Sequence, residues 1–98
     1  MYRPFVVIET RGPAWDDSQS MDNQTDWPAH AAFMDSLVAD RFVLLGGPLE
    51  GTRDVLLVIQ ADDYAGIMDR LAADPWMQKG LLSVKECQPW RIRLGSLP

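Results

Sequence analysis

The spacing of apolar residues divides the chain into six predicted elements. Short runs rich in valine, isoleucine, leucine and phenylalanine predict strands over residues 3–10, 42–45 and 55–59, and a last strand over 82–94 that Pro89 can interrupt. Apolar residues at helical spacing predict helices over residues 27–40 and about 63–73. With right-handed crossovers, this βαββαβ order predicts a ferredoxin-like α+β fold, in which one face of a four-stranded antiparallel sheet carries both helices.

Cap and turn residues set the predicted ends of these elements. Asp26 precedes the first helix and is expected to cap it, and either Asp62 or Asp63 caps the second. Pro75 disfavours a helical backbone at the residue before it, so the second helix should stop near residue 73. The segment Gly46-Gly47-Pro48 is expected to close the second strand as a turn.

A polar segment over residues 11–26 links the first strand to the first helix. It is longer than most connections, and long loops in compact domains are typically functional or mobile. Trp15 and Met21 are its large apolar side chains, so each is a candidate anchor that would hold the loop as a flap.

Three predicted strands are apolar on both faces. Residues 55–59 read Val-Leu-Leu-Val-Ile, and residues 5–8 and 42–45 follow the same pattern. An antiparallel sheet with one face in water alternates apolar with polar side chains, because neighbouring side chains point to opposite faces. A contiguous apolar face of this size is expected to be covered. The strands therefore predict a homodimer in which the two sheets pack face to face.

Composition and charge narrow the classes of partner. The 98 residues suit one domain spanning 1–98, and the net charge of −5 opposes binding to nucleic acid or to an anionic membrane surface. Cys87 is the single cysteine, and no Cys/His spacing indicates a metal site. Without a signal-like segment, a membrane-spanning run or a cofactor motif, the sequence predicts a cytoplasmic protein that needs no cofactor.

The one histidine, His30, lies in the first turn of the first predicted helix, on the face that should turn inward. Helical spacing places it with Phe33, Met34 and Leu37. A polar group in such a stripe needs a partner, because burial removes its water. Two interpretations stay open. His30 is either a core histidine bonded to the backbone, or a general base positioned for proton transfer.

Four short motifs resemble those of the YciI-like proteins, in the same order over nearly the whole chain: Pro28-Ala29-His30, Gly46-Gly47-Pro48-Leu49, Ala73-Asp74-Pro75-Trp76 and Pro89-Trp90. The resemblance implies a dimeric α+β barrel, in which two ferredoxin-like chains pair through their sheets. It also implies a candidate catalytic pair at the matching histidine and aspartate, His30 and Asp74. Most members of that family have no established reaction, and at least one eliminates chloride from a chlorinated, hydroxylated aromatic compound.

Two positions depart from the family pattern. Related sequences often carry an arginine shortly before the Pro-Ala-His segment, where it would hold an anionic substrate, and here residues 24–27 contain no basic side chain. Arg41 stands where a glycine commonly ends the first helix. The first departure weighs against an inherited preference for acidic substrates.

The residues and the resemblance together predict a small cofactor-independent enzyme of the lyase or isomerase kind, acting on a small cyclic or aromatic metabolite. His30 would take a proton and Asp74 would fix its ring, with ligand contacts expected from Trp27, Phe33, Gly46, Gly47, Pro48 and Trp76. Asp74 also has a structural interpretation, as the N-cap of the turn that begins at Pro75. The alternative function is a non-catalytic ligand-binding or accessory dimerisation module.

Overall fold

The computed structural model describes residues 2–96, which contain four strands and four helical segments. In chain order these are β1 (Arg3–Arg11), the short 3₁₀ helix η1 (Met21–Asn23), α1 (Trp27–Ala39), β2 (Val43–Pro48), β3 (Asp54–Ala61), α2 (Tyr64–Leu71), α3 (Pro75–Gln78) and β4 (Leu82–Pro89). No helix within residues 2–96 is both long enough and apolar enough to cross a membrane.

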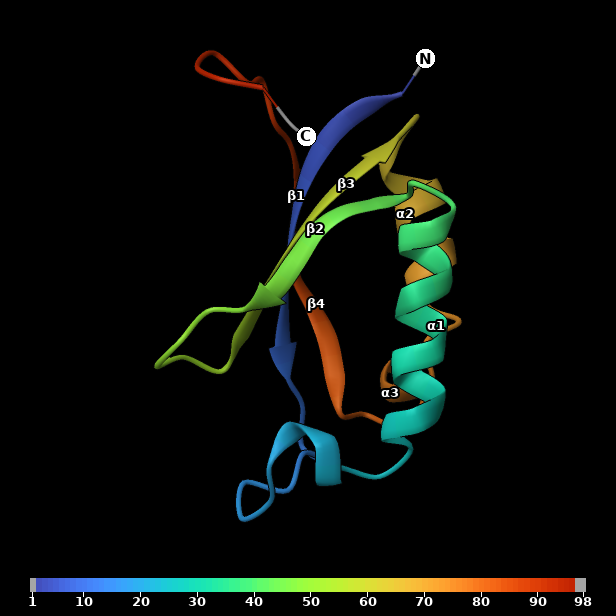
Figure 1. Cartoon of the computed structure of the whole chain (residues 1–98), viewed down its shortest axis with the longest axis vertical. Helices are drawn as coiled ribbons and strands as arrows, with labels where there is room; N and C mark the ends of the chain where they lie inside the picture. Colours follow the sequence, from blue (N-terminus) through green and yellow to red (C-terminus); the bar gives the residue numbers. More distant parts are fainter. Residues whose placement is uncertain (1, 97–98) are drawn as a thin grey trace.

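The four strands form one antiparallel sheet in the order β2-β3-β1-β4, and α1, α2 and α3 lie on the same side of it (Figure 1). This arrangement confirms the predicted ferredoxin-like α+β fold with βαββαβ order. β1 and β3 are the central strands, while β2 and β4 form the edges. α1 packs against the edge strand β2, and the cavity described below lies between them.

Side-chain alternation along β1 explains the main hydrophobic core. Phe5 and Val7 point toward the helices and are almost completely buried. They pack with Ile59 and Leu57 of β3, which lie opposite them in the strand register and share the same face of the sheet. Leu37 of α1 belongs to the same cluster and joins the helix to the sheet.

A second hydrophobic cluster packs the long loop against the other end of the sheet. Trp15, Trp76, Leu81 and Leu82 are its buried members, and Met21 packs against them. Both predicted anchors of the loop are therefore confirmed.

Close backbone contacts give this loop a fixed path beside the N-terminal end of α1. The N–H of Gly12 donates to the carbonyl oxygen of Leu81 at 2.8 Å. A Cβ at Gly12 would come within 2.3 Å of the carbonyl oxygen of Gly80, so only glycine allows this approach. The buried side-chain amide of Gln24 accepts from the N–H of Asp16 and donates to its carbonyl oxygen.

The boundaries of β2 and β4 differ most from the prediction. β2 continues through Gly46-Gly47-Pro48 instead of ending in a turn there. It is an edge strand, where a proline and the register shift after Val43 are tolerated. β4 ends at Pro89 and not at residue 94, because proline has no N–H with which to continue the ladder. One more backbone bond follows, from the N–H of Trp90 to the carbonyl oxygen of Pro4.

Asp26 occupies the predicted N-cap position of the first helix, but it does not cap the helix with its side chain. Asp26 has a φ of 60°, and its side chain makes no capping hydrogen bond to α1. The carboxylate of Asp26 pairs with Lys79. Asp63 caps α2, as one of the two expected candidates, by accepting from the N–H of Gly66 at 2.8 Å.

Candidate functional site

A cavity of about 370 Å³ lies between α1 and the sheet. α1 contributes Trp27, His30 and Met34, β2 contributes Gly46-Gly47-Pro48, and α3 contributes Trp76. Most of the wall is apolar, and a volume of a few hundred cubic ångströms is usual for a small-molecule pocket. The cavity is large enough for one small ring.

His30 and Asp74, 44 positions apart in sequence, meet at this cavity. Nδ1 of His30 lies 2.8 Å from Oδ1 and 3.0 Å from Oδ2 of Asp74. The aspartate is fully buried, and the histidine side chain keeps 11% of its surface exposed. Because an ionised carboxylate only accepts hydrogen bonds, we assign the ring hydrogen to Nδ1, which leaves Nε2 as an acceptor. Nε2 has no hydrogen-bond partner within residues 2–96.

The backbone explains why Asp74 reaches two partners. It precedes Pro75 and has an extended conformation, as residues before proline usually do. Its Oδ1 accepts from the N–H of Trp76 at 2.9 Å, which makes it the N-cap of α3. The cap and the contact with His30, which the sequence left as alternatives, therefore coexist in one carboxylate.

Trp76 supports the imidazole of His30. The two rings stack with centroids 3.7 Å apart and planes 6° apart, and Nε1–H of Trp76 donates to the carbonyl oxygen of Thr25 at 2.6 Å. Trp15 meets Trp76 edge-on at 5.2 Å, and Trp27 is tilted against it at 5.7 Å. Since Trp76 is only 1% exposed, it holds the histidine ring in place more than it offers a face to a ligand. Trp27 is half-buried and retains accessible surface.

Five of the residues predicted to contact a ligand line the cavity: Trp27, Gly46, Gly47, Pro48 and Trp76. Phe33 does not line it, and this side chain packs against the main hydrophobic core. Of the two positions one turn after His30, both pack against the core, and Met34 alone also lines the cavity. The cavity wall therefore includes Met34 in place of the expected Phe33.

Sequence reasoning missed Glu9, which lines the same cavity from β1. It is 1% exposed, and its Oε2 is enclosed with no hydrogen-bond partner within residues 2–96. Burial raises the pKa of this carboxyl from 4.5 to about 7, and the nearby charge of Asp74 raises it as well. A signal was present in the sequence: Phe5, Val7 and Glu9 alternate along one strand, so the carboxyl was due to point inward with them.

Arg11 is a second cavity residue that the sequence did not reveal. It ends β1, and its guanidinium lies 4.5 Å from the centroid of the Trp15 ring. Residues 24–27 carry no cation, but the fold brings this one to the cavity from the end of the first strand. Spacing within one segment does not predict such a contact, because a long loop separates β1 from α1.

No three His, Cys, Asp or Glu side chains within residues 2–96 are grouped so as to hold a metal ion. The fold and the cavity together define a small ferredoxin-like α+β protein with a buried histidine–aspartate pair. The chain belongs to the family of the YCII-related domain, whose family model matches residues 5–91. This match confirms the family predicted from the four sequence motifs.

Among solved structures, the chain is similar to 5-chloro-2-hydroxyhydroquinone dehydrochlorinase from Burkholderia phenoliruptrix AC1100, determined as a complex with 2,5-dihydroxybenzoquinone. The TM-score is 0.69 at 20% sequence identity, with 90% of this chain and 93% of that chain covered. At this identity the likeness shows a shared fold. No curated protein matches the chain.

Proposed function

We propose that this protein is a small cofactor-independent enzyme of the lyase or isomerase type, which moves protons on a cyclic or aromatic metabolite. The observation that carries the proposal is the contact of His30 with Asp74 at the wall of an apolar cavity sized for one ring. A histidine held in one orientation, with one ring nitrogen free to accept, is suited to general-base catalysis.

In this proposal His30 is the base and Asp74 orients it. With Nδ1 held by the carboxylate, Nε2 is the acceptor for a proton from a hydroxyl or a ring carbon of the substrate. As the imidazole gains that proton, the adjacent carboxylate stabilises its positive charge. Stacking on Trp76 supports the same ring orientation.

Removal of the proton leaves an electron pair that enters the substrate ring. In an isomerisation, another position of the ring then takes up a proton. In an elimination, a halide leaves with its bonding electrons. The structurally similar dehydrochlorinase is named for a chlorinated hydroquinone, and its structure is a complex with a dihydroxybenzoquinone, so hydroxylated rings are the first substrate class to test here.

The test compares proton transfer in the native protein with that in His30→Ala. Two assays serve: chloride release from 5-chloro-2-hydroxyhydroquinone, and deuterium uptake from D₂O into enolisable cyclic ketones, followed by NMR. Removing a general base should lower the rate by about 10²–10⁴-fold, while the dissociation constant of a ring ligand changes little. Asp74→Asn keeps the side-chain volume and tests the orienting role separately.

Two results would contradict the proposal. If the native protein binds a ring but accelerates neither reaction, the cavity belongs to a non-catalytic binding module. If His30→Ala keeps the native rate, the contact between His30 and Asp74 is structural and another group performs the chemistry.

We also infer that the partner of this chain is a second copy of itself. The outer face of the sheet carries the side chains that alternate with the core: Val6, Ile8, Leu45, Leu56 and Val58. Val6 lies opposite Val58, and Ile8 lies opposite Leu56, so the apolar surface is continuous across the central strands. Because this face points away from the helices, it supports the sheet-on-sheet pairing predicted from the sequence.

Light scattering coupled to size-exclusion chromatography tests the dimer. The native chain of 11.0 kDa should elute at twice this mass. Ile8→Lys combined with Leu56→Lys places two like charges opposite each other on the apolar face and should give the monomer mass. Ala65→Lys, at an exposed position of α2 on the other side of the sheet, is the control and should stay dimeric. A monomeric native protein would rule out the pairing.

A further inference from the structure

Glu9 is a titratable residue of the cavity that has no role in the proposed chemistry of His30 and Asp74. Glu9 is 1% exposed and lines the cavity, and its Oε2 has no hydrogen-bond partner among residues 2–96. Buried polar atoms in native proteins are almost always paired, because losing water without gaining a partner is costly. An unpaired carboxyl oxygen beside an apolar cavity therefore points to a partner that arrives with the ligand.

The surroundings of Glu9 favour a protonated carboxyl. Its neighbours in the strand register, Val55 on β3 and Val84 on β4, are apolar. The titratable and charged side chains around the cavity come from α1, from the turn before α3 and from β1: His30, Asp35, Asp74 and Arg11. Burial raises the pKa of Glu9 to about 7, and the charge of Asp74 adds to the rise. The carboxyl thus keeps its proton in mildly acidic solution.

We propose that Glu9 is the second proton-transfer residue of this cavity, and that its carboxyl donates to an oxygen atom of a cyclic ketone or quinone substrate. The inference rests on the proposed function, because it needs His30 as the base at the same ring. The two groups then have opposite roles: the imidazole offers an unprotonated nitrogen and the carboxyl offers an acidic hydrogen. Titratable groups in contrasting environments commonly divide acid and base roles in this way.

The proposed step balances without an added reagent. Nε2 of His30 takes a proton from a ring carbon next to a carbonyl, and the electron pair of that C–H bond forms a carbon–carbon double bond. The carbonyl oxygen takes the proton of Glu9, which gives an enol, an imidazolium and a carboxylate. In a conjugated dienol, the imidazolium then gives its proton to a different ring carbon while the enol hydroxyl returns its proton to the carboxylate of Glu9, which completes an isomerisation. Where the carbon beside the new double bond carries a halide, the enol returns its proton to Glu9 and expels the halide with its bonding electrons.

This pairing narrows the substrate class. The ring must offer an oxygen acceptor to Glu9 and an acidic hydrogen to His30 within one cavity of about 370 Å³. Enolisable cyclic ketones, cyclic enones and hydroxyquinones meet both requirements. An alkyl-substituted ring without oxygen meets neither.

Two probes of nearly the same shape isolate the hydrogen bond to Glu9. Acetophenone offers a carbonyl acceptor, ethylbenzene offers none, and neither compound titrates between about pH 5 and about pH 9. Their dissociation constants are measured by NMR over that range for the native protein and for Glu9→Gln. In the native protein the preference for acetophenone over ethylbenzene, given by the ratio of their dissociation constants, should fall by about threefold to tenfold as the pH rises across this range. In Glu9→Gln it should stay constant, because the amide donates at every pH.

A second readout needs only the native protein. The carbonyl carbon of ¹³C-labelled acetophenone shifts downfield when its oxygen accepts a hydrogen bond. The shift of the bound probe should follow the ionisation of Glu9, moving upfield as the carboxyl loses its proton. A residue with a purely structural role would leave this signal unchanged.

The outcomes separate this proposal from the proposed function. The role of Glu9 is overturned if neither the preference for acetophenone nor the carbonyl shift changes with pH in the native protein. Loss of deuterium uptake in His30→Ala would then still support His30 as the general base. Retained uptake in His30→Ala overturns the proposed function and with it the paired step. If neither probe binds the native protein, the cavity is not a ring site and both proposals fail.

Discussion

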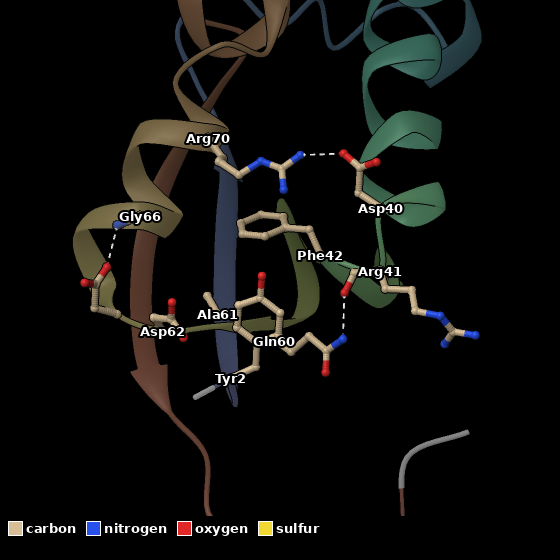
Figure 2. Close-up of a pocket in the computed structure, with 10 residues that line it drawn as sticks. Tyr2, Asp40, Arg41, Phe42, Gln60, Ala61, Asp62, Gly66 and Arg70 are labelled. Carbon is tan, nitrogen blue, oxygen red and sulfur yellow. Dashed lines mark hydrogen bonds and ion pairs between the residues drawn. The ribbon is translucent and has the colours of Figure 1, made fainter.

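The two ends of α1 each lie beside a pair of titratable side chains, and one pair is buried while the other is exposed. At the N-terminal end, His30 and Asp74 meet beside the cavity with side-chain exposures of 11% and 1%. At the C-terminal end, a smaller pocket of about 220 Å³ carries an ion pair between Arg70 and Asp40, whose side chains are 41% and 59% exposed (Figure 2). The contact distances, 2.8 Å and 2.9 Å, are nearly equal. Burial is therefore what distinguishes the two ends.

In the second pocket, polar groups of the wall find partners in other residues of the same wall. Gln60 donates to the carbonyl oxygen of Arg41, and the guanidinium of Arg70 lies over the ring of Phe42 at 4.4 Å (Figure 2). The cavity at the other end instead holds the enclosed oxygen of Glu9, which has no hydrogen-bond partner in the described part of the chain, residues 2–96. A functional site is expected where burial and an incomplete set of partners coincide, which favours the N-terminal end.

Removing one aspartate from each end gives the largest expected contrast. Asp74→Ala leaves the imidazole of His30 and the N–H of Trp76 without their acceptor inside the protein. The free energy of unfolding should fall by about 3 to 5 kcal/mol. Asp40→Ala breaks an exposed ion pair and should cost at most about 1 kcal/mol. Urea denaturation of both variants beside the native chain measures the two losses, and equal losses would contradict the comparison.

Glu9 should make stability depend on pH. Its pKa rises from the ordinary value of 4.5 to about 7 in the folded chain, so the folded state holds the proton more tightly than the unfolded state. The contribution of Glu9 is therefore most favourable below pH 4.5 and is lost as the pH rises toward 7. The full loss amounts to about 3 kcal/mol.

Glu9→Gln has no proton to lose and should not show this decline. Urea denaturation of the variant and of the native chain at a series of pH values gives two curves. Subtracting one curve from the other cancels the contribution of the other carboxyl groups to the pH dependence of stability. The variant should gain stability relative to the native chain as the pH rises through that window, whereas a constant difference would mean that Glu9 titrates as an exposed carboxyl does.

The aromatic contacts at the two ends of α1 should also differ in how much stability they contribute, but by less than the two aspartates do. Trp76→Phe keeps an aromatic ring next to His30 and removes the hydrogen bond to the carbonyl oxygen of Thr25, at an expected cost of about 2 kcal/mol. Arg70→Met keeps an unbranched side chain over Phe42 and removes the charge, together with its exposed ion pair to Asp40, which should cost less than about 1 kcal/mol. Thermal unfolding of both variants tests the order, and a larger loss in Arg70→Met would reverse it.

The fold and the positions of most of the predicted cavity residues follow from local patterns. Alternation in the strands, helical spacing around His30 and the proline after Asp74 each constrain a few neighbouring residues, and these constraints add up to the observed topology. The meeting of His30 with Asp74 is different, because 44 positions separate them. A family resemblance indicated that pair, whereas spacing within either segment did not.

The features that the sequence did not predict have physical causes as well. Asp26 has the residue type and the position of a cap, and the sequence gives no sign of its left-handed backbone or of its ion pair with Lys79. Arg11 reaches the cavity through the path of a loop, which composition does not define. Glu9 was open to prediction, because it continues the inward alternation of Phe5 and Val7 along the strand. Its missing partner, however, is a property of the folded site alone.

The backbone at the C-terminal end of α1 gives the smallest expected effect. Arg41 has a φ of 59°, and its N–H donates to the carbonyl oxygen of Val38, while the N–H of Phe42 donates to that of Leu37. This bonding pattern ends many helices and favours glycine at the left-handed position. The side chain of Arg41 extends away from the ring of Phe42 (Figure 2), so its removal should cost little packing.

Arg41→Gly should therefore raise the free energy of unfolding by about 1 kcal/mol or less. Glycine avoids the steric cost of a Cβ at positive φ, and part of this gain is offset by the greater freedom of the unfolded chain. In a domain of this size the increase in Tm should be at most about 4–8 °C. Arg41→Ala is the matched control, because it removes the same side chain but keeps the Cβ, and it should not become more stable. Equal Tm values for the two variants would mean that the left-handed backbone is not the source of the gain. Ring binding in the cavity at the other end should be unchanged in both, since stability at one end of α1 and ligand affinity at the other depend on separate contacts.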